Sequence, residues 1–294
     1  MKKSVAVYSL LVLVVSFGVA GVYFLLFPRT TGSDFALAIG YMWLPALVSL
    51  FLLRREGRSI KELSPWKKPN RWFFFGWLVF LVVGLANLPV NALFPGSVFT
   101  PDMSGFIEQY RELMDPVQFE EMARQASETP WFPFLMMVVQ GLAAGLTVNM
   151  VAAFGEELGW RGYLYRELEG MGFWRISLYT GALWGFWHAP LIANGHNYPG
   201  YPVAGIFLMV LWCILLSPLF TLIRQRAGSV LAASVAHGTL NGVGMISAMY
   251  ISGGHPLVNG LLGLSGFVTL GLFNLLIFLW LKREKSREQK IPVA

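Results

Sequence analysis

The chain has 294 residues, of which 55% are hydrophobic and 13% charged, with a formal net charge of +6. A soluble domain carries about 25% charged residues, so this composition excludes an ordinary soluble protein and indicates an integral membrane protein. Cys213 is the single cysteine, which excludes disulfides within the chain and metal clusters built from cysteines.

Long segments without Asp, Glu, Lys or Arg predict membrane-spanning helices, each of which needs about 20 apolar residues. The longest of these segments, 176–223 and 227–281, are each long enough for two spans, with turns predicted at 194–202 and 252–255. The sequence predicts an all-α polytopic bundle of about eight transmembrane helices, near residues 4–27, 35–53, 72–94, 131–155 and beyond, 176–193, 203–223, 229–250 and 258–281. A cleaved signal peptide is the alternative for 1–27, although its apolar run is longer than usual for one.

The distribution of Lys and Arg predicts the orientation of the chain. With the N-terminus inside, 19 of the 22 basic residues fall on the cytoplasmic side, and Arg29, Arg111 and Arg124 fall outside. We therefore expect a multi-pass protein of the plasma membrane with both termini in the cytoplasm. This asymmetry accounts for the net charge, so the charge gives no indication of nucleic-acid binding.

Ionisable residues inside otherwise apolar segments are the most informative feature of the sequence. They are Glu156, Glu157 and Arg161 in G-E-E-L-G-W-R, His188 in W-G-F-W-H, and His237 followed by Asn241 in H-G-T-L-N. A charge at the centre of a membrane helix costs about 2.5–3.5 kcal/mol on insertion scales, so such residues usually face one another or a water-filled cavity. We therefore interpret them as parts of one site.

Helix geometry is compatible with a single site. Three pairs have i, i+4 spacing and so share a helix face: Trp184 with His188, Glu157 with Arg161, and His237 with Asn241. Neighbouring residues point about 100° apart, so we assign Glu156 to the cavity and Glu157 to a supporting pair with Arg161. Counted from the basic ends of their segments, Glu156, His188 and His237 lie about 15, 20 and 16 Å deep. Glycine pairs at four-residue spacing in the same segments predict close helix packing.

The motifs E-E-x-x-x-R, aromatic-x-x-x-H and H-x-x-x-N, in this order, resemble the CAAX prenyl protease and bacteriocin-processing family of intramembrane proteases, which includes the Ras-converting enzymes. The resemblance covers roughly residues 131–250. Trp184 stands where the family more often has Phe. The resemblance implies peptide-bond hydrolysis, in which Glu156 and His188 activate a water molecule and His237 and Asn241 stabilise the oxyanion. Glu157, Arg161 and Trp184 would support them.

Metal dependence has two alternatives in the sequence. Glu156, His188 and His237 are a plausible zinc set with an open position for water, although the chain lacks H-E-x-x-H. We favour water activated by a glutamate without a required metal cofactor, over a zinc metalloendopeptidase. The other histidines, His196 and His255, fall in predicted turns and are expected to be ordinary loop residues.

These interpretations divide the chain into three regions. Residues 1–130 form a three-helix membrane region with an acidic outer loop over 95–130, residues 131–250 the catalytic core, and residues 251–294 a last helix and a basic cytoplasmic tail. The expected substrate is a membrane-anchored protein or peptide, prenylated or not, cut near the cytoplasmic face. The alternative from another class is a non-catalytic transporter or an immunity-type binding protein that uses the same buried polar cluster.

Overall fold

The computed structural model describes residues 2–108, 111 and 115–288, so a part of the acidic loop and the end of the tail lie outside the described residues. The described chain is almost entirely helical, as predicted, with one antiparallel pair of three-residue strands, β1 (Ser97–Phe99) and β2 (Ile251–Gly253). Its helices are α1 (Lys3–Leu26), α2 (Thr31–Arg55), the 3₁₀-helix η1 (Ile60–Leu63), α3 (Arg71–Asn91), α4 (Ser104–Ile107), α5 (Pro116–Glu128), α6 (Trp131–Leu146), α7 (Val148–Glu157), the π-helix η3 (Leu158–Leu164), α8 (Tyr165–Leu168), α9 (Phe173–Trp187), α10 (Ala189–Ala193), α11 (Pro202–Ala227), α12 (Val230–Val243), α13 (Ile246–Met249) and α14 (Leu264–Glu288).

The number of helices that could cross a membrane is lower than the eight expected. Among the described residues, six helical segments are long and apolar enough, or seven if the pair α5 and α6, bent by 99°, counts as one span. The segment expected to span at 176–193 is the 15-residue α9 followed by the short α10. The segment expected to continue through 131–155 is interrupted at Thr147, whose backbone angles are not helical.

The start of the last helix also differs from the prediction. We expected the last span to begin at residue 258, whereas α14 begins at Leu264. Residues 256–263 instead form a compact turn that is closed by backbone hydrogen bonds, such as the one from Gly263 N to Gly260 O. Apolar composition alone could not distinguish this turn from the first turns of a helix.

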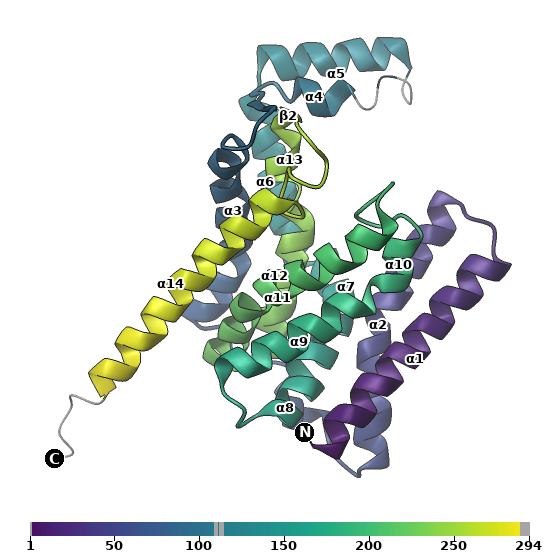
Figure 1. Cartoon of the computed structure of the whole chain (residues 1–294), viewed down its shortest axis with the longest axis vertical. Coiled ribbons are helices and arrows are strands. Elements are labelled where there is room, and N and C mark those ends of the chain that lie inside the picture. Colours follow the sequence, from purple (N-terminus) through teal and green to yellow (C-terminus); the bar gives the residue numbers. More distant parts are fainter. Residues whose placement is uncertain (1, 109–110, 112–114, 289–294) are drawn as a thin grey trace.

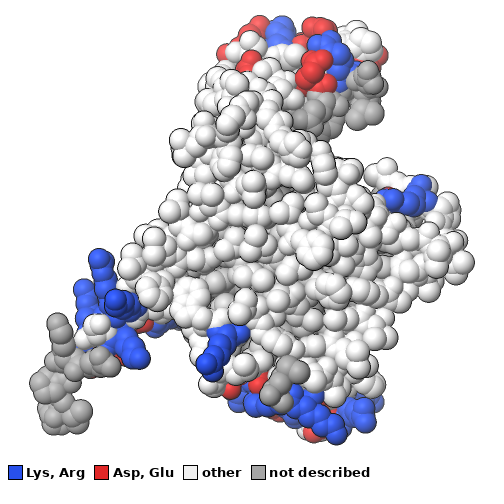
Figure 2. Space-filling model, viewed as in Figure 1, with Lys and Arg blue, Asp and Glu red and all other residues white. Residues whose placement is uncertain are grey.

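The two ends of the bundle differ in charge (Figures 1 and 2). Lys and Arg gather at the end where α1 begins and α8 lies, which we call the basic pole. The opposite pole carries α5, which lies across the end of the bundle with a mixture of acidic and basic side chains. Asp115 caps α5 by accepting hydrogen bonds from Val117 N and Gln118 N, and Phe119 and Ala126 are its buried residues.

Helix α12 lies in the core of the bundle, against α3, α6, α7 and α11. Its approach to α7 depends on Gly238, where a Cβ would lie 2.7 Å from Met150 N. The contact between α9 and α11 depends in the same way on Gly185, where a Cβ would lie 2.4 Å from the Cα of Val210. These close approaches agree with the small-residue packing expected from the sequence, and they bring the motif-bearing helices together.

Candidate active site

The first motif lies where α7 changes into the π-helix η3. Glu156 and Glu157 are the last residues of α7, and Arg161 lies within η3. π-helical turns are rare and occur frequently at functional sites, because the wider turn reorients side chains that an α-helix would stack. All three side chains are almost fully buried. The change of helix type therefore occurs within the motif itself.

Glu156 is held by two tryptophans. Its Oε2 accepts a hydrogen bond of 2.6 Å from Trp184 Nε1, on α9, and one of 3.3 Å from Trp160 Nε1, one turn along its own helix. Both indoles and the carboxylate are buried. The two N–H groups offset part of the cost of burying this carboxylate and fix its orientation. The described residues donate no hydrogen bond to Oε1, which is available to a bound molecule.

Glu157 forms a separate network. Its Oε1 lies 3.2 Å from Arg161 Nη1 and 2.9 Å from His237 Nδ1 on α12. Glu157 and Arg161 form the ion pair that the i, i+4 spacing predicts, and both are almost inaccessible. The carboxylate therefore joins η3 to α12 and orients the imidazole of His237.

The guanidinium of Arg161 lies between two aromatic rings, 4.7 Å from the centroid of Trp184 and 4.5 Å from that of Phe220. Its Nη2 donates to Ser217 Oγ at 3.3 Å. A cation in this position is stabilised by the ring faces as well as by Glu157. Arg161 is therefore a part of the packed centre, although the count of basic residues by side placed it with the cytoplasmic ones.

His188 is oriented by its own helix. Its Nδ1 lies 2.8 Å from the backbone carbonyl oxygen of Trp184. A carbonyl oxygen can only accept, so Nδ1 carries the hydrogen, and Nε2 of the neutral ring is left as an acceptor. The imidazole also packs against Trp187, with ring centroids 4.7 Å apart. Trp184 thus contacts both Glu156 and His188, through its indole and its carbonyl group respectively.

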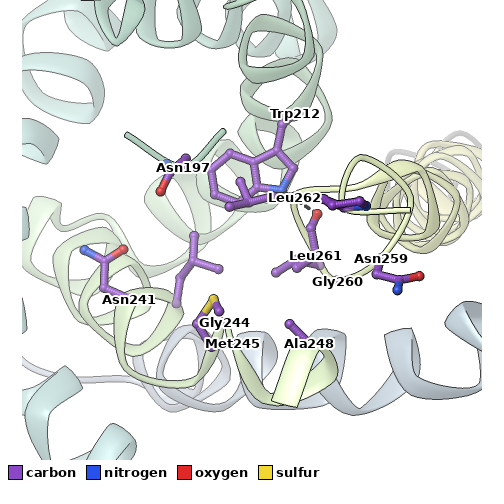
Figure 3. Close-up of a pocket in the computed structure, with 12 residues that line it drawn as sticks. Asn197, Trp212, Asn241, Gly244, Met245, Ala248, Asn259, Gly260, Leu261 and Leu262 are labelled. Atoms are coloured by element: carbon purple, nitrogen blue, oxygen red, sulfur yellow. Dashed lines mark hydrogen bonds between the residues drawn. The ribbon is translucent and has the colours of Figure 1, made fainter. Parts of the chain in front are cut away.

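Asn241 is the most exposed of the motif residues. It lies one turn after His237 on α12, and its carboxamide has no hydrogen bond to any other residue that the structure describes. It lines a cavity of about 420 Å³ (Figure 3), which also contacts α11 and the turn before α14. His196 lies in the loop between α10 and α11, and His255 contacts Tyr201 at the opposite pole.

The structure thus gathers the buried motif residues around Trp184, with one contact that was not expected. The sequence assigned Glu157 only to a pair with Arg161, whereas Glu157 also bonds His237 Nδ1. Sequence reasoning also missed Trp160, Ser217 and Phe220. Trp160 had a usable signal, since it lies four residues after Glu156. The other two belong to α11, which carries no polar motif, and no sequence signal marks them.

The proposed zinc set can be tested against this geometry. Both imidazoles engage Nδ1 within the protein and leave Nε2 free, as metal-ligating histidines commonly do. However, among residues 2–108, 111 and 115–288 no three His, Cys, Asp or Glu side chains lie in an arrangement that could hold a metal ion. Glu156, His188 and His237 therefore do not fit a bound zinc as they are placed here.

Comparisons with known proteins agree with the motif assignment. Residues 130–243 match the family described as type II CAAX prenyl endopeptidase Rce1-like. A CAAX prenyl protease 2 from Methanococcus maripaludis is 40% identical over 54 residues, which are 18% of this chain and 20% of that protein. The aligned part thus spans about a fifth of that relative. The chain is an integral, multi-pass membrane protein, and the resemblance predicted from its three motifs is confirmed over residues 130–243, which match the Rce1-like family.

Proposed function

We propose that this protein is an intramembrane endopeptidase of the CAAX-protease type that hydrolyses a peptide bond in a membrane-anchored protein, prenylated or not. The proposal is supported by the family match over residues 130–243 and by one observation above all. Trp184 fixes two groups suited to activate water. Its indole donates a hydrogen bond to Glu156, and its backbone carbonyl group accepts one from Nδ1 of His188.

In the proposed mechanism, Glu156 accepts a proton from a water molecule through its free Oε1, while Nε2 of His188 accepts a second hydrogen bond from that water. The water oxygen attacks the scissile carbonyl carbon and forms a tetrahedral oxyanion. His237, when protonated and bonded to Glu157 through Nδ1, presents Nε2–H to that oxyanion, and the Asn241 amide is a second donor. Return of the proton from Glu156 to the leaving nitrogen breaks the peptide bond.

The test is cleavage of a membrane-tethered peptide by the wild type and by Glu156→Gln, His188→Ala, His237→Ala and Asn241→Ala. Removal of one oxyanion donor costs about 10²–10³ in turnover in other enzymes, and loss of the general base should cost at least as much. Because the residues act as a unit, double variants should lose far less than the product of the single losses. Wild-type rates in folded variants would contradict the assignment.

Two further measurements separate the alternatives. A transporter or immunity-type protein would lose ligand flux or protection in Glu156→Gln without any proteolytic product of the wild type. Stoichiometric zinc in purified protein, with loss of turnover on chelation, would replace the glutamate mechanism by a metallopeptidase one. We propose the plasma membrane as the site of action, and immunofluorescence or membrane fractionation tests this.

A further inference from the structure

Helices α1 and α2 lie outside the region that matches the family, yet they contact the segments that carry Glu156 and His188. They form a hairpin that packs against α7 through α2, and against α9 and α10 through α1 (Figure 1). Three of its residues make the closest approaches to these segments. They are Ser16 on α1 and the consecutive residues Tyr41 and Met42 on α2.

The first of these contacts is at the break between α9 and α10, directly before His188. In a continuous α-helix, Leu191 N would donate to the carbonyl oxygen of Trp187, four residues earlier, but here it donates to that of His188. Pro190 has no N–H group to offer instead. The hydroxyl group of Tyr41 supplies a donor, 2.9 Å from the Trp187 carbonyl oxygen, and both residues are buried. The backbone next to His188 is therefore tied to α2.

The side chain of Trp187 is tied to the other helix of the hairpin. Its Nε1 donates to Ser16 Oγ at 2.8 Å, and both residues are buried. The centroid of its ring lies 4.4 Å from that of Tyr41 on one side and 4.7 Å from that of His188 on the other. Trp187 is thus held through its backbone and through its indole, and the imidazole of His188 packs against this fixed ring.

The same part of α2 also touches the segment of Glu156. A Cβ at Gly155, the residue before Glu156, would lie 2.7 Å from the carbonyl oxygen of Met42, so the backbones of α2 and α7 are in contact there. Met42 follows Tyr41 directly in the sequence. Two consecutive residues of α2 therefore contact the segments of Glu156 and His188, and closely packed backbones transmit a displacement of one to the other.

We propose that the α1–α2 hairpin sets the place of His188 relative to Glu156, with Tyr41 and Ser16 as positioning residues. This inference rests on the proposed protease function. Two groups that share one water molecule must both lie within hydrogen-bond reach of it, about 2.6–3.2 Å. A small displacement of the imidazole therefore lowers turnover without weakening the binding of substrate. The hairpin, which the family match does not cover, thereby becomes a part of the catalytic apparatus.

Conservative substitutions test this role through the cleavage of a membrane-tethered peptide. Tyr41→Phe removes the hydroxyl group and keeps the ring against Trp187, while Ser16→Ala removes the acceptor of the indole. Each should lower kcat about tenfold and leave KM within about twofold of the wild type. Wild-type kcat in both variants, or a loss that appears in KM alone, would overturn the proposal.

Tyr23→Phe is the matched control, since it removes a hydroxyl group that joins α1 to Ser33 and Asp34 at the far end of the same hairpin. It should keep the wild-type kcat. An equal loss of kcat in Tyr23→Phe and Tyr41→Phe would assign the effect to a loosened hairpin and overturn the role of Tyr41.

Nitrogen-15 NMR of the histidine side chains gives a readout that does not depend on activity. The chain has four histidines, and the signals of His188 are the ones that disappear in His188→Ala. Tyr41→Phe should shift the ring-nitrogen signals of His188 and leave those of His255 unchanged, and Tyr23→Phe should shift neither. Unshifted His188 signals in Tyr41→Phe would overturn the positioning. A wild type that cleaves nothing, with His188 signals that still shift in Tyr41→Phe, would refute the protease function and retain the positioning.

Discussion

The indole nitrogen of Trp184 lies 2.6 Å from Oε2 of Glu156, which makes it the closest side-chain partner of the proposed general base. A phenylalanine at this position would keep the aromatic packing and lose the donor. We expect Trp184→Phe to fold and to cleave about ten- to a hundredfold more slowly, because a hydrogen bond to a charged group contributes about 1.5–3 kcal/mol. Single-turnover cleavage rates at saturating substrate measure this loss.

Trp77→Phe is the matched control, since it removes an indole hydrogen bond of 3.0 Å to the carbonyl oxygen of Leu142, away from the motif residues. If both variants slow cleavage equally, the effect belongs to general destabilisation. A wild-type rate of cleavage by Trp184→Phe would show that the indole does not position Glu156.

The sequence predicted the membrane class, the helical fold and the motif residues, because apolar run length and the cost of buried charge are local properties. It also predicted the ion pair of Glu157 and Arg161, since i, i+4 spacing defines neighbours along a helix. The geometry of a single helix could not predict that His237 bonds to Glu157. This contact joins residues 80 positions apart and depends on how α12 packs against α7.

The remaining errors have a common physical origin. A run of apolar residues is equally compatible with a membrane-spanning helix, a pair of short helices and a buried turn. Residues 258–263 of the turn were therefore included in the last span, and the short helices α9 and α10 were counted as a full one. Depth estimates along ideal helices likewise contained no information on residues 64–65, whose carbonyl groups accept hydrogen bonds from Val230 N and Leu231 N at the start of α12.

The buried pair of Glu157 and Arg161 should respond asymmetrically to mutation. We expect Arg161→Met to destabilise the protein by about 3–5 kcal/mol, because it leaves a buried carboxylate without its cation. The double variant Glu157→Gln/Arg161→Met should recover part of this loss, since no uncompensated charge remains. Thermal unfolding in detergent compares Arg161→Met, Glu157→Gln and the double variant with the wild type. A double variant less stable than the sum of the single effects would contradict this account.

Helix contact at Gly185 should not tolerate a side chain. A Cβ there would lie 2.4 Å from the Cα of Val210, and a backbone atom can move only if α11 shifts. We expect Gly185→Ala to cost about 1–3 kcal/mol of stability and to lower cleavage by displacing His188, three residues later. Gly18→Ala is the control, because no atom of the described residues lies within 4 Å of its Cβ position in α1. It should be neutral or stabilising, as expected for alanine in a helix.

The bracing of the cavity by Asn91 gives the last prediction. Its Oδ1 accepts from Gly260 N at 2.9 Å and from Ser265 Oγ at 2.8 Å, and both donors are buried. Asn91→Leu leaves Gly260 N unpaired at a cost of about 1–3 kcal/mol, while the Ser265 hydroxyl keeps the carbonyl oxygen of Gly260 as an acceptor, so the turn should open more often. Hydrogen exchange of amides 256–263 should become faster in Asn91→Leu.

The control is Asn274→Leu, which removes a single bond from α14 to the carbonyl oxygen of Leu215 and leaves the turn intact. It should leave exchange in 256–263 unchanged. If the cavity receives the substrate, Asn91→Leu should also raise KM more than it lowers kcat, because the border of the binding space loosens while Glu156 and His188 keep their partners. Unchanged exchange would mean that the hydrogen bonds from Trp212 and Tyr198 suffice to hold the turn. An effect on kcat without an effect on KM would mean that the cavity does not bind the substrate.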